Sequence, residues 1–219
     1  QDVESVFNLL ANQSKIPRLN KLMIAPFHLQ RSLIDKVEKT AQAAAQGVAS
    51  RIILKMNTLT DEKLMEALVH AGQAGVQIDL IIRGACMLPA QRPGVTDNIR
   101  VRSIIGRFLE HSRVFYFRTG NDESLYLSSA DWMNRNMLRR VELAWPVEDA
   151  ALRQRVIDEC LVAYLHDNVD AWSLNADGQY TRVQPAKPKR ASSKTTQPTT
   201  PAPLHGAQAA LMALYAAKL

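Results

Sequence analysis

The sequence lacks long apolar runs, contains few cysteines and aromatic residues, and has no lysine over more than half of its length. No stretch approaches the ~20 apolar residues of a membrane-spanning helix, and the first residues do not form a basic segment followed by an apolar one. The two cysteines, Cys86 and Cys160, are spaced like no metal site and suit a reducing compartment without disulfides. We therefore expect a cytoplasmic protein.

Lysine is absent between Leu64 and Ala186, although that stretch contains thirteen arginines. An arginine guanidinium presents a planar fork of donors to two phosphate oxygens, whereas a lysine is a point charge. A codon composition biased toward arginine explains the pattern equally well. The net charge of +6 is a weaker signal, because the acid-free segment from Pro185 to Leu219 supplies five positive charges and leaves +1 for the rest.

A length of 219 residues, with 47% hydrophobic and 22% charged residues, is typical of one globular domain with appendages. The chain begins at Gln1 within a helix-like pattern, so we expect a longer parent protein, with residues 1–20 forming the end of a preceding domain or a linker. Residues 21–184 are expected to be the folded domain. Residues 185–219 are expected to be a disordered, low-complexity basic tail. The tail ends in a candidate short helix, Ala207–Leu219, that we expect to fray in solvent rather than dock on another subunit or a membrane surface.

Apolar strands alternate with amphipathic helices in the first half of this domain. Because such alternation, with strands dense in Ile, Leu and Val, is typical of parallel sheets covered by helices, the pattern predicts an α/β fold with a largely parallel sheet. A helix is expected to begin near Asp61, with Asn57, Thr58 and Thr60 supplying capping oxygens. In chain order we predict strand Lys21–Ala25, helix Leu29–Gly47, strand Arg51–Met56, a helix closed by Gly75, strand Val76–Ile82, strand Arg139–Val147, helix Glu148–Asp167, and a hairpin of Val169–Leu174 with Gln179–Val183.

The segment from Ile105 to Arg140 predicts a β-hairpin with polar residues beside it. Two β-branched and aromatic runs, Val114–Phe117 and Ser124–Ser129, flank the turn formers Gly120, Asn121 and Asp122. His111 precedes the first strand, and Ser128–Asp131 lies where the second strand ends. We expect hydrogen-bond donors from both arms to meet at one mouth, where α/β sheets usually bind ligands.

Most of the chain, from Lys21 to about Gln184, resembles the C-terminal part of the large, histidine-phosphorylated polyphosphate kinases. The phrases that carry the resemblance are RIILKMNTLTDEKLMEAL, IDLIIRGAC, NIRVRSIIGRFLEHSRVFYF, LYLSSADWMNRN and RRVELAWPVED. The resemblance implies a phospholipase D-like domain with a mixed, mainly parallel sheet. It also implies a parent enzyme that reversibly transfers the terminal phosphate of ATP to polyphosphate through a phosphohistidine. That histidine belongs to the preceding domain, so this fragment is expected to be inactive alone.

The resemblance also implies which residues contact phosphate. His111, in GRFLEHSR, corresponds to a second active-site histidine that contacts the ATP phosphates and can donate a proton near neutral pH. Arg83 ends the strand IDLIIR, and Gly84 lets the backbone turn there, so its guanidinium is expected at the strand's carboxyl edge, on the nucleotide phosphates. Arg140 corresponds to a further ATP-phosphate-binding arginine.

Arg107 and Arg113 flank His111 and are expected to line a polyphosphate path, although one of them can instead pair with Glu110 or Asp131. Magnesium is expected to accompany ATP. No Asp, Glu or His cluster has convincing ligand spacing, so we predict no metal ligand in this chain. The expected partners are ATP or ADP, polyphosphate, and other copies of the parent in a homo-oligomer. The basic tail also suggests peripheral contact with the inner membrane face.

Two alternatives compete with this interpretation. His111-Ser112-Arg113 resembles half of the phospholipase D signature, His-x-Lys followed by four residues and Asp, but arginine replaces the lysine and Arg118 replaces the aspartate. These departures disfavour phosphodiester hydrolysis. The arginine content also suits a nucleic-acid-binding module. The low aromatic content, 6%, provides few residues on which bases could stack, so we expect no specific nucleic-acid partner.

Overall fold

The computed structural model describes residues 1–12, 19–184 and 203–217. Its centre is one nine-stranded sheet with the strand order β1-β7-β6-β5-β2-β3-β4-β8-β9. The strands, from β1 to β9, are Met23–Ala25, Ser50–Met56, Gln77–Ile82, Ile99–Ile104, Val114–Thr119, Asp122–Ser128, Glu142–Pro146, Ala171–Leu174 and Tyr180–Arg182. The hairpin predicted at its centre is confirmed, since β5 and β6 pair antiparallel around a turn at Gly120.

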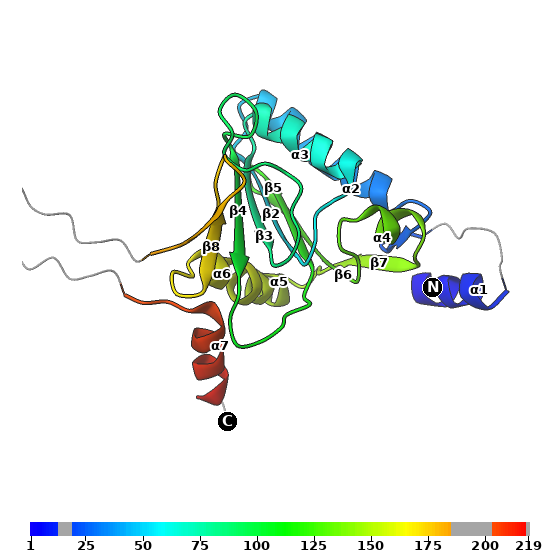
Figure 1. Cartoon of the computed structure of the whole chain (residues 1–219). Coiled ribbons are helices and arrows are strands. Elements are labelled where there is room, and N and C mark those ends of the chain that lie inside the picture. The colour runs from blue at the N-terminus through cyan, green and yellow to red at the C-terminus, as the bar shows by residue number, and fades with distance from the viewer. Residues whose placement is uncertain (13–18, 185–202, 218–219) are drawn as a thin grey trace, which may run out of the picture.

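Helices cover both faces of the sheet. Figure 1 shows α2 and α3 on one side of the strands and α5 and α6 on the other, while α7 projects from the lower end. The helices are α1 Asp2–Asn12, α2 Leu29–Ala45, α3 Glu62–Gln73, α4 Asn134–Leu138, α5 Ala150–Val156, the π-helical segment η1 Ile157–Val162, α6 Ala163–Leu165 and α7 Ala207–Ala216. Among the described residues, no helix is both long enough and apolar enough to cross a membrane.

The mixed α/β fold class is confirmed, but the expectation of a mainly parallel sheet is wrong. Among the strands of the described residues, only β2 with β3 and β3 with β4 pair in parallel. The remaining six strand pairs are antiparallel, and β1 lies at the far edge beside β7. A continuous run of apolar residues in a strand indicates that both faces of that strand are buried. Here helices cover both faces of antiparallel strands as well, so the composition could not reveal direction.

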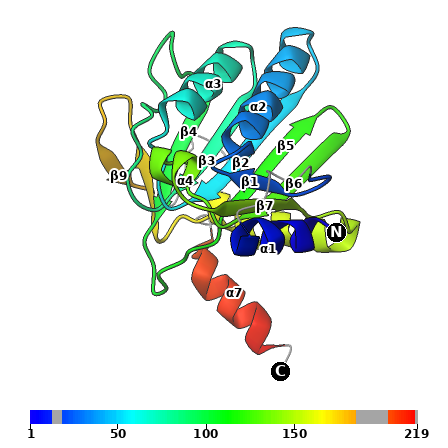
Figure 2. The same cartoon turned by 90° about the vertical axis from the view of Figure 1, so that its right-hand side faces the viewer.

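Strand β2 divides its side chains between two hydrophobic cores. Ile52 and Leu54 face the core under α2 and α3, whereas Ile53 faces a second core built with Leu161 of η1 and Tyr164 of α6. Figure 2 shows α2 and α3 lying along the strands on the first face. Burying each such aliphatic side chain contributes about 1.5–3 kcal/mol. These two cores therefore fix the strand ends from both sides.

The start of α3 differs in detail from the prediction. The N-cap is Asp61, whose carboxylate accepts a hydrogen bond from the backbone N–H of Leu64 at 3.1 Å and from the side chain of Gln30. Asn57, which was expected among the capping residues, makes its contacts with strand-end side chains instead. The capping oxygen therefore comes from the residue directly before the helix, as N-cap geometry requires.

The expectation that the terminal helix frays in solvent is wrong for its first turn. Ala207 is fully buried, and its N–H donates to Asp167 at 2.7 Å. Gln208 is 5% exposed and exchanges hydrogen bonds with the backbone of Phe108. Specific polar contacts thus dock the helix, whereas Leu214, further along, is 42% exposed. The disorder predicted from residue 185 falls mainly on residues 185–202, outside the described residues.

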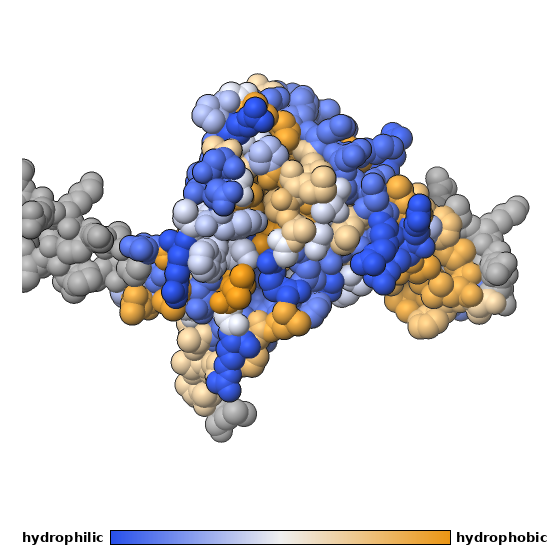
Figure 3. All heavy atoms as spheres, in the orientation of Figure 1, coloured by the Kyte–Doolittle hydropathy of each residue, from blue (hydrophilic) through white to orange (hydrophobic). Residues whose placement is uncertain are grey.

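Helix α1 carries apolar side chains on two faces. Val6 and Leu9 pack with Ile24 of β1 in a small third core. Val3 and Phe7 are 60% and 67% exposed, and Figure 3 shows a hydrophobic surface around this helix at the right of the view. Exposed apolar patches of this kind mark contact surfaces. The assignment of residues 1–20 to a preceding domain or linker stays a prediction.

Candidate functional site

Several loops meet where β2 and β3 end. Because β5 runs antiparallel to β2, Lys55 near the end of β2 lies opposite Val114 at the start of β5. Val114 in turn lies opposite Leu127 near the end of β6. The segments after β2, β3 and β6 and the segment before β5 therefore share one edge of the sheet, as the hairpin prediction required. We call this edge the strand-end site.

Asp131, after β6, is at the centre of the strand-end site. Its carboxylate accepts hydrogen bonds from the backbone N–H of Asn57 at 2.7 Å, and from the Nε and Nη2 of Arg113 at 3.3 and 3.1 Å. Asp131 is 8% exposed, so this charge is removed from water and compensated by a guanidinium and a backbone donor. The Arg113–Asp131 ion pair joins the two arms of the hairpin.

Arg83 lies at the carboxyl end of β3, as predicted. Its Nε and Nη2 both donate to the side-chain oxygen of Asn57, at 3.0 and 2.8 Å. Asn57 also donates its backbone N–H to Asp131, so a continuous chain of contacts links Arg83, Asn57, Asp131 and Arg113. Gly84 permits the tight turn after Arg83, since an added Cβ would stand 2.9 Å from the carbonyl oxygen of Asn57. Among the described residues, the Nη1 of Arg83 forms no hydrogen bond.

His111 is exposed and lies two residues before Arg113 in the loop between β4 and β5. The Nη1 of Arg113 donates to the backbone carbonyl of His111 at 2.7 Å, which fixes the main chain at this point. Of the two pairings left open for Arg113, the structure has the one with Asp131. Arg107, on the same loop, is exposed, and its guanidinium lies 5.7 Å from the ring centre of Phe108.

Lys55 was not predicted as a site residue, yet it is a buried cation of the strand-end site. Its Nζ donates to Glu110 at 2.8 Å and lies 3.3 Å from the ring centre of Tyr164. Burial lowers the pKa of Lys55, and the neighbouring Glu110 carboxylate opposes that effect. Tyr164 donates its hydroxyl to Glu110 in a short hydrogen bond, and burial together with this bond raises the pKa of Tyr164.

Glu110 anchors the loop that carries His111. Besides Lys55 and Tyr164, its carboxylate accepts a hydrogen bond from the Nε2 of Gln208 in α7 at 3.2 Å. The same amide nitrogen donates to the carbonyl of Phe108 at 3.0 Å. Side chains from β2, α6 and α7 therefore converge on the residue directly before His111 and hold the loop from which His111 projects.

Arg140 is placed between α4 and β7, and its Nη1 lies 3.8 Å from Glu142. Glu142 also accepts hydrogen bonds from Ser129 and Asn136. Ser129 is two residues before Asp131, so one short segment after β6 connects the surroundings of Arg140 with the strand-end network. Direct contacts from Arg140 to His111 or Arg83 are absent among the described residues. The side chain of Arg140 is 55% exposed.

Metal-binding geometry is also absent from the part of the chain that the structure describes. No three His, Cys, Asp or Glu side chains there come together as a group that would hold an ion. Asp131, the most buried carboxylate of the strand-end network, already faces Arg113. These residues do not fit a protein-bound magnesium ion.

For some of the site residues that were not predicted, the sequence did contain a usable signal. Asn57 follows β2 directly, so the rule that ligands gather at carboxyl strand ends could have included it. Asp131 was considered as a possible partner of Arg107 or Arg113 and not as a site residue, although it follows β6 at the same edge. Lys55 could not be inferred, because its burial depends on Glu110, which is 55 residues away in the sequence, and on Tyr164, which is a further 54 residues from Glu110.

The fold and the site define a mixed α/β domain with basic side chains gathered at one edge of its sheet. The family model described as polyphosphate kinase C-terminal domain 2 matches residues 22–194, and the chain belongs to this family. The polyphosphate kinase of Pseudomonas aeruginosa is 52% identical over 185 residues, which make up 84% of this chain and 27% of that protein. The chain thus spans about a quarter of the length of the curated relatives that it matches.

A solved structure of a polyphosphate kinase agrees with this assignment. The crystal structure of polyphosphate kinase from Porphyromonas gingivalis matches with a TM-score of 0.85 and 32% identity, over 99% of this chain and 31% of that chain. A phospholipase D family member, Nuc from Salmonella typhimurium, matches with a TM-score of 0.46 and 14% identity, over 63% of this chain and 88% of that chain.

Proposed function

We propose that this chain is part of a polyphosphate kinase that transfers the terminal phosphate of ATP reversibly to a polyphosphate chain. In this proposal a histidine of the preceding domain attacks the terminal phosphorus, an N–P bond forms, and the bond to ADP breaks. The phosphoryl group then passes to the end of the polymer and the histidine is regenerated. The observation that carries the proposal is the membership of the chain in the polyphosphate kinase C-terminal domain family.

The strand-end residues supply the supporting chemistry in this proposal. Phosphoryl transfer depends mainly on positioned cations and donors around the transferred group. Arg83, oriented by Asn57, offers its remaining N–H edge to phosphate oxygens. His111, on the loop anchored by Glu110, donates a proton to the oxygen that leaves, or shares positive charge with it. Arg140 contacts the ATP phosphates, and Arg107 lines the path of the polymer, whereas Arg113 pairs with Asp131 and holds the loop that carries His111.

The isolated chain should bind ATP weakly and show no turnover. The enclosed space lined by Lys55, Asn57 and Arg83 measures about 20 Å³, whereas sites for such ligands usually enclose about 300–1,000 Å³. The complete ATP site therefore requires further walls from the parent protein. Magnesium enters with ATP in this proposal, and its protein ligands lie outside the chain. The parent is expected to act as a cytoplasmic homo-oligomer, with peripheral contact to the inner membrane face through the basic tail.

An arginine-to-lysine comparison in the parent tests the role of Arg83. Arg83→Lys keeps the charge but loses both donors to Asn57 and the fork toward phosphate, so we expect at least ~10-fold weaker apparent ATP affinity. Arg92→Lys is the matched control, because the Arg92 side chain is exposed and its neighbour Gln91 donates its N–H to Ile99 at the start of β4, the end opposite the strand-end site. Equal ATP affinity in both variants would exclude bidentate phosphate binding by Arg83.

A further inference from the structure

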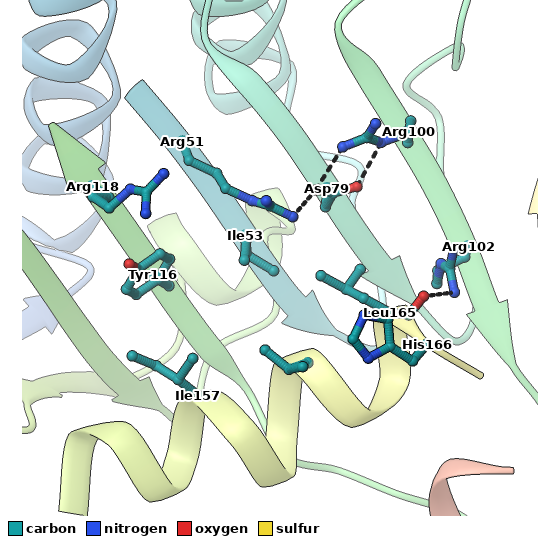
Figure 4. Close-up of a pocket in the computed structure, with 11 residues that line it drawn as sticks. Arg51, Ile53, Asp79, Arg100, Arg102, Tyr116, Arg118, Ile157, Leu165 and His166 are labelled. Atoms are coloured by element: carbon teal, nitrogen blue, oxygen red, sulfur yellow. Dashed lines mark hydrogen bonds and ion pairs between the residues drawn. The ribbon is translucent and has the colours of Figure 1, made fainter. Parts of the chain in front are cut away.

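A second basic pocket lies at the opposite end of the same strands. Its volume is about 560 Å³, and it opens on the sheet face that carries α5, η1 and α6. These helices cover the half of that face nearer the strand-end site, where Ile53 and Ile81 are buried. The other half is lined by charged side chains from β2, β3, β4 and β5 (Figure 4). We call this hollow the arginine pocket.

The arginine pocket holds four guanidinium groups and one carboxylate. Asp79 accepts hydrogen bonds from Arg51 at 2.7 Å and from Arg100 at 2.8 and 3.0 Å, so two arginines share one acid (Figure 4). Arg102 donates to the backbone carbonyl of Leu165 at 2.6 Å and has no carboxylate partner among the described residues. Arg118 is exposed and, within the described ranges, its side chain makes no ion pair or hydrogen bond.

The acidic residue paired with Arg118 on the neighbouring strand does not neutralise the excess positive charge of the arginine pocket. Glu123, which lies opposite Arg118 across the β5–β6 pair, accepts a hydrogen bond from Tyr116 and forms an ion pair with Arg153. Arg51 and Arg118 are themselves direct cross-strand partners on β2 and β5. Like charges in this arrangement destabilise a sheet. The bare pocket is therefore electrostatically unfavourable, and a bound anion would relieve it.

The arginines of the pocket lie in a row across the strands and do not surround a single point. Arg118, Arg51 and Arg100 stand on β5, β2 and β4, with β3 between the last two. Three strand spacings of about 4.8 Å separate the backbones of Arg118 and Arg100 by roughly 14 Å. The guanidinium groups lie closer together than the backbones, because Arg51 and Arg100 both reach Asp79 on β3. One orthophosphate cannot contact cations on strands from β5 to β3, whereas a chain of linked phosphates can. The Tyr116 ring in the pocket is 6% exposed, so it offers no platform on which a nucleobase could stack.

We propose that the arginine pocket binds a condensed phosphate chain of three or more phosphates. It is a second anion site, separate from the strand-end site and independent of whether the parent is a kinase. Arg118 contacts the bound phosphate chain directly, and Arg51 and Arg100 contact it while they pair with Asp79. Arg102, on the same strand as Arg100, adds a further positive charge at that end of the row. The negative oxygens of successive phosphates match the cations along the strands.

Calorimetric titration of the 219-residue chain tests this proposal, with orthophosphate, tripolyphosphate and a linear polyphosphate of defined length as probes. We expect affinity to rise in that order. Arg118→Gln should weaken tripolyphosphate binding at least ~10-fold, which corresponds to about 1.4 kcal/mol. Arg92→Gln, which removes the same charge from an exposed loop, should change it less than about twofold. Arg118→Gln should not lower the melting temperature, because it removes a like-charge pair.

Three results would overturn the proposal. Equal loss of binding in Arg118→Gln and Arg92→Gln would mean diffuse attraction to a basic chain. Tighter binding of a single-stranded oligonucleotide than of polyphosphate with the same charge would make the pocket a nucleic-acid site. Unchanged polyphosphate affinity of the parent on Arg118→Gln would mean that another part of the parent covers the pocket. Loss of binding with undiminished kinase activity would support the second site without affecting the proposed function.

Discussion

Replacing Glu110 with glutamine should destabilise the domain much more than the same change at Glu148. Both glutamates pair with a lysine, at 2.8 Å to Lys55 and at 2.5 Å to Lys21. The Lys55 and Glu110 side chains are only 8% and 23% exposed, whereas both members of the Lys21–Glu148 pair are 60% exposed. The two variants make the same chemical change, but Glu110 is the more buried of the two and also accepts hydrogen bonds from Tyr164 and Gln208.

The expected loss of stability depends on the surroundings of each lysine once its glutamate is replaced by glutamine. Removing one member of a buried pair costs about 3–5 kcal/mol. The introduced amide would retain an acceptor oxygen toward Lys55 and Tyr164, so we expect about 2–3 kcal/mol for Glu110→Gln, or a fall in melting temperature of about 5–10 °C for a chain of this size. Exposed pairs contribute at most about 1 kcal/mol. Glu148→Gln should accordingly leave the melting temperature almost unchanged.

The assay is reversible thermal or urea unfolding of both variants at several pH values. The pKa of Lys55 in the folded protein is below its usual 10.5, so between these two values the unfolded state binds more protons and stability rises with pH. The deficit of Glu110→Gln should therefore shrink as the pH rises toward about 10, because a neutral Lys55 needs no counterion. Equal stability losses in Glu110→Gln and Glu148→Gln would mean that burial does not strengthen the Lys55–Glu110 pair.

Three further predictions concern single contacts of the strand-end network and the core beside it. Asp131→Asn keeps an acceptor for the N–H of Asn57 but removes the charge opposite Arg113, and urea unfolding should show a loss of about 1–2 kcal/mol; no loss would mean that the ion pair is not needed. Gln208→Ala should increase amide hydrogen exchange in residues 105–113, and unchanged protection there would show that α7 does not hold the loop. Burial raises the pKa of Cys86 to about 11, so iodoacetamide at about pH 8 should alkylate it roughly 100-fold more slowly in the native chain than in urea; equal rates would contradict its burial.

The sequence predicted local structure better than it predicted pairing. The β5–β6 hairpin was accessible because Gly120 and its neighbours specify the turn within a few residues. The direction of the sheet was not, since β1 finds its partner β7 more than a hundred residues later. Tertiary contacts of this range leave no trace in local composition.

Local sequence also predicted the site residues better than it predicted their long-range contacts. Arg83 was placed correctly at a strand end because the run of apolar residues and Gly84 define where β3 stops. Lys55 was overlooked, since a lysine in a strand ordinarily indicates a surface position, and only Glu110 and Tyr164 make its burial tolerable. Gln208 was overlooked because it lies in the alanine-rich tail, 100 residues from Phe108.

Polymer synthesis from ATP in the parent protein measures whether the strand-end site takes part in phosphoryl transfer. His111→Ala should reduce synthesis by ~100-fold or more, as expected for loss of a positioned acid or charge partner, while the melting temperature stays unchanged. His70→Ala is the matched control, because His70 is exposed on α3, and it should retain normal synthesis. Near-normal synthesis by His111→Ala would contradict the account and leave His111 as an ordinary surface residue.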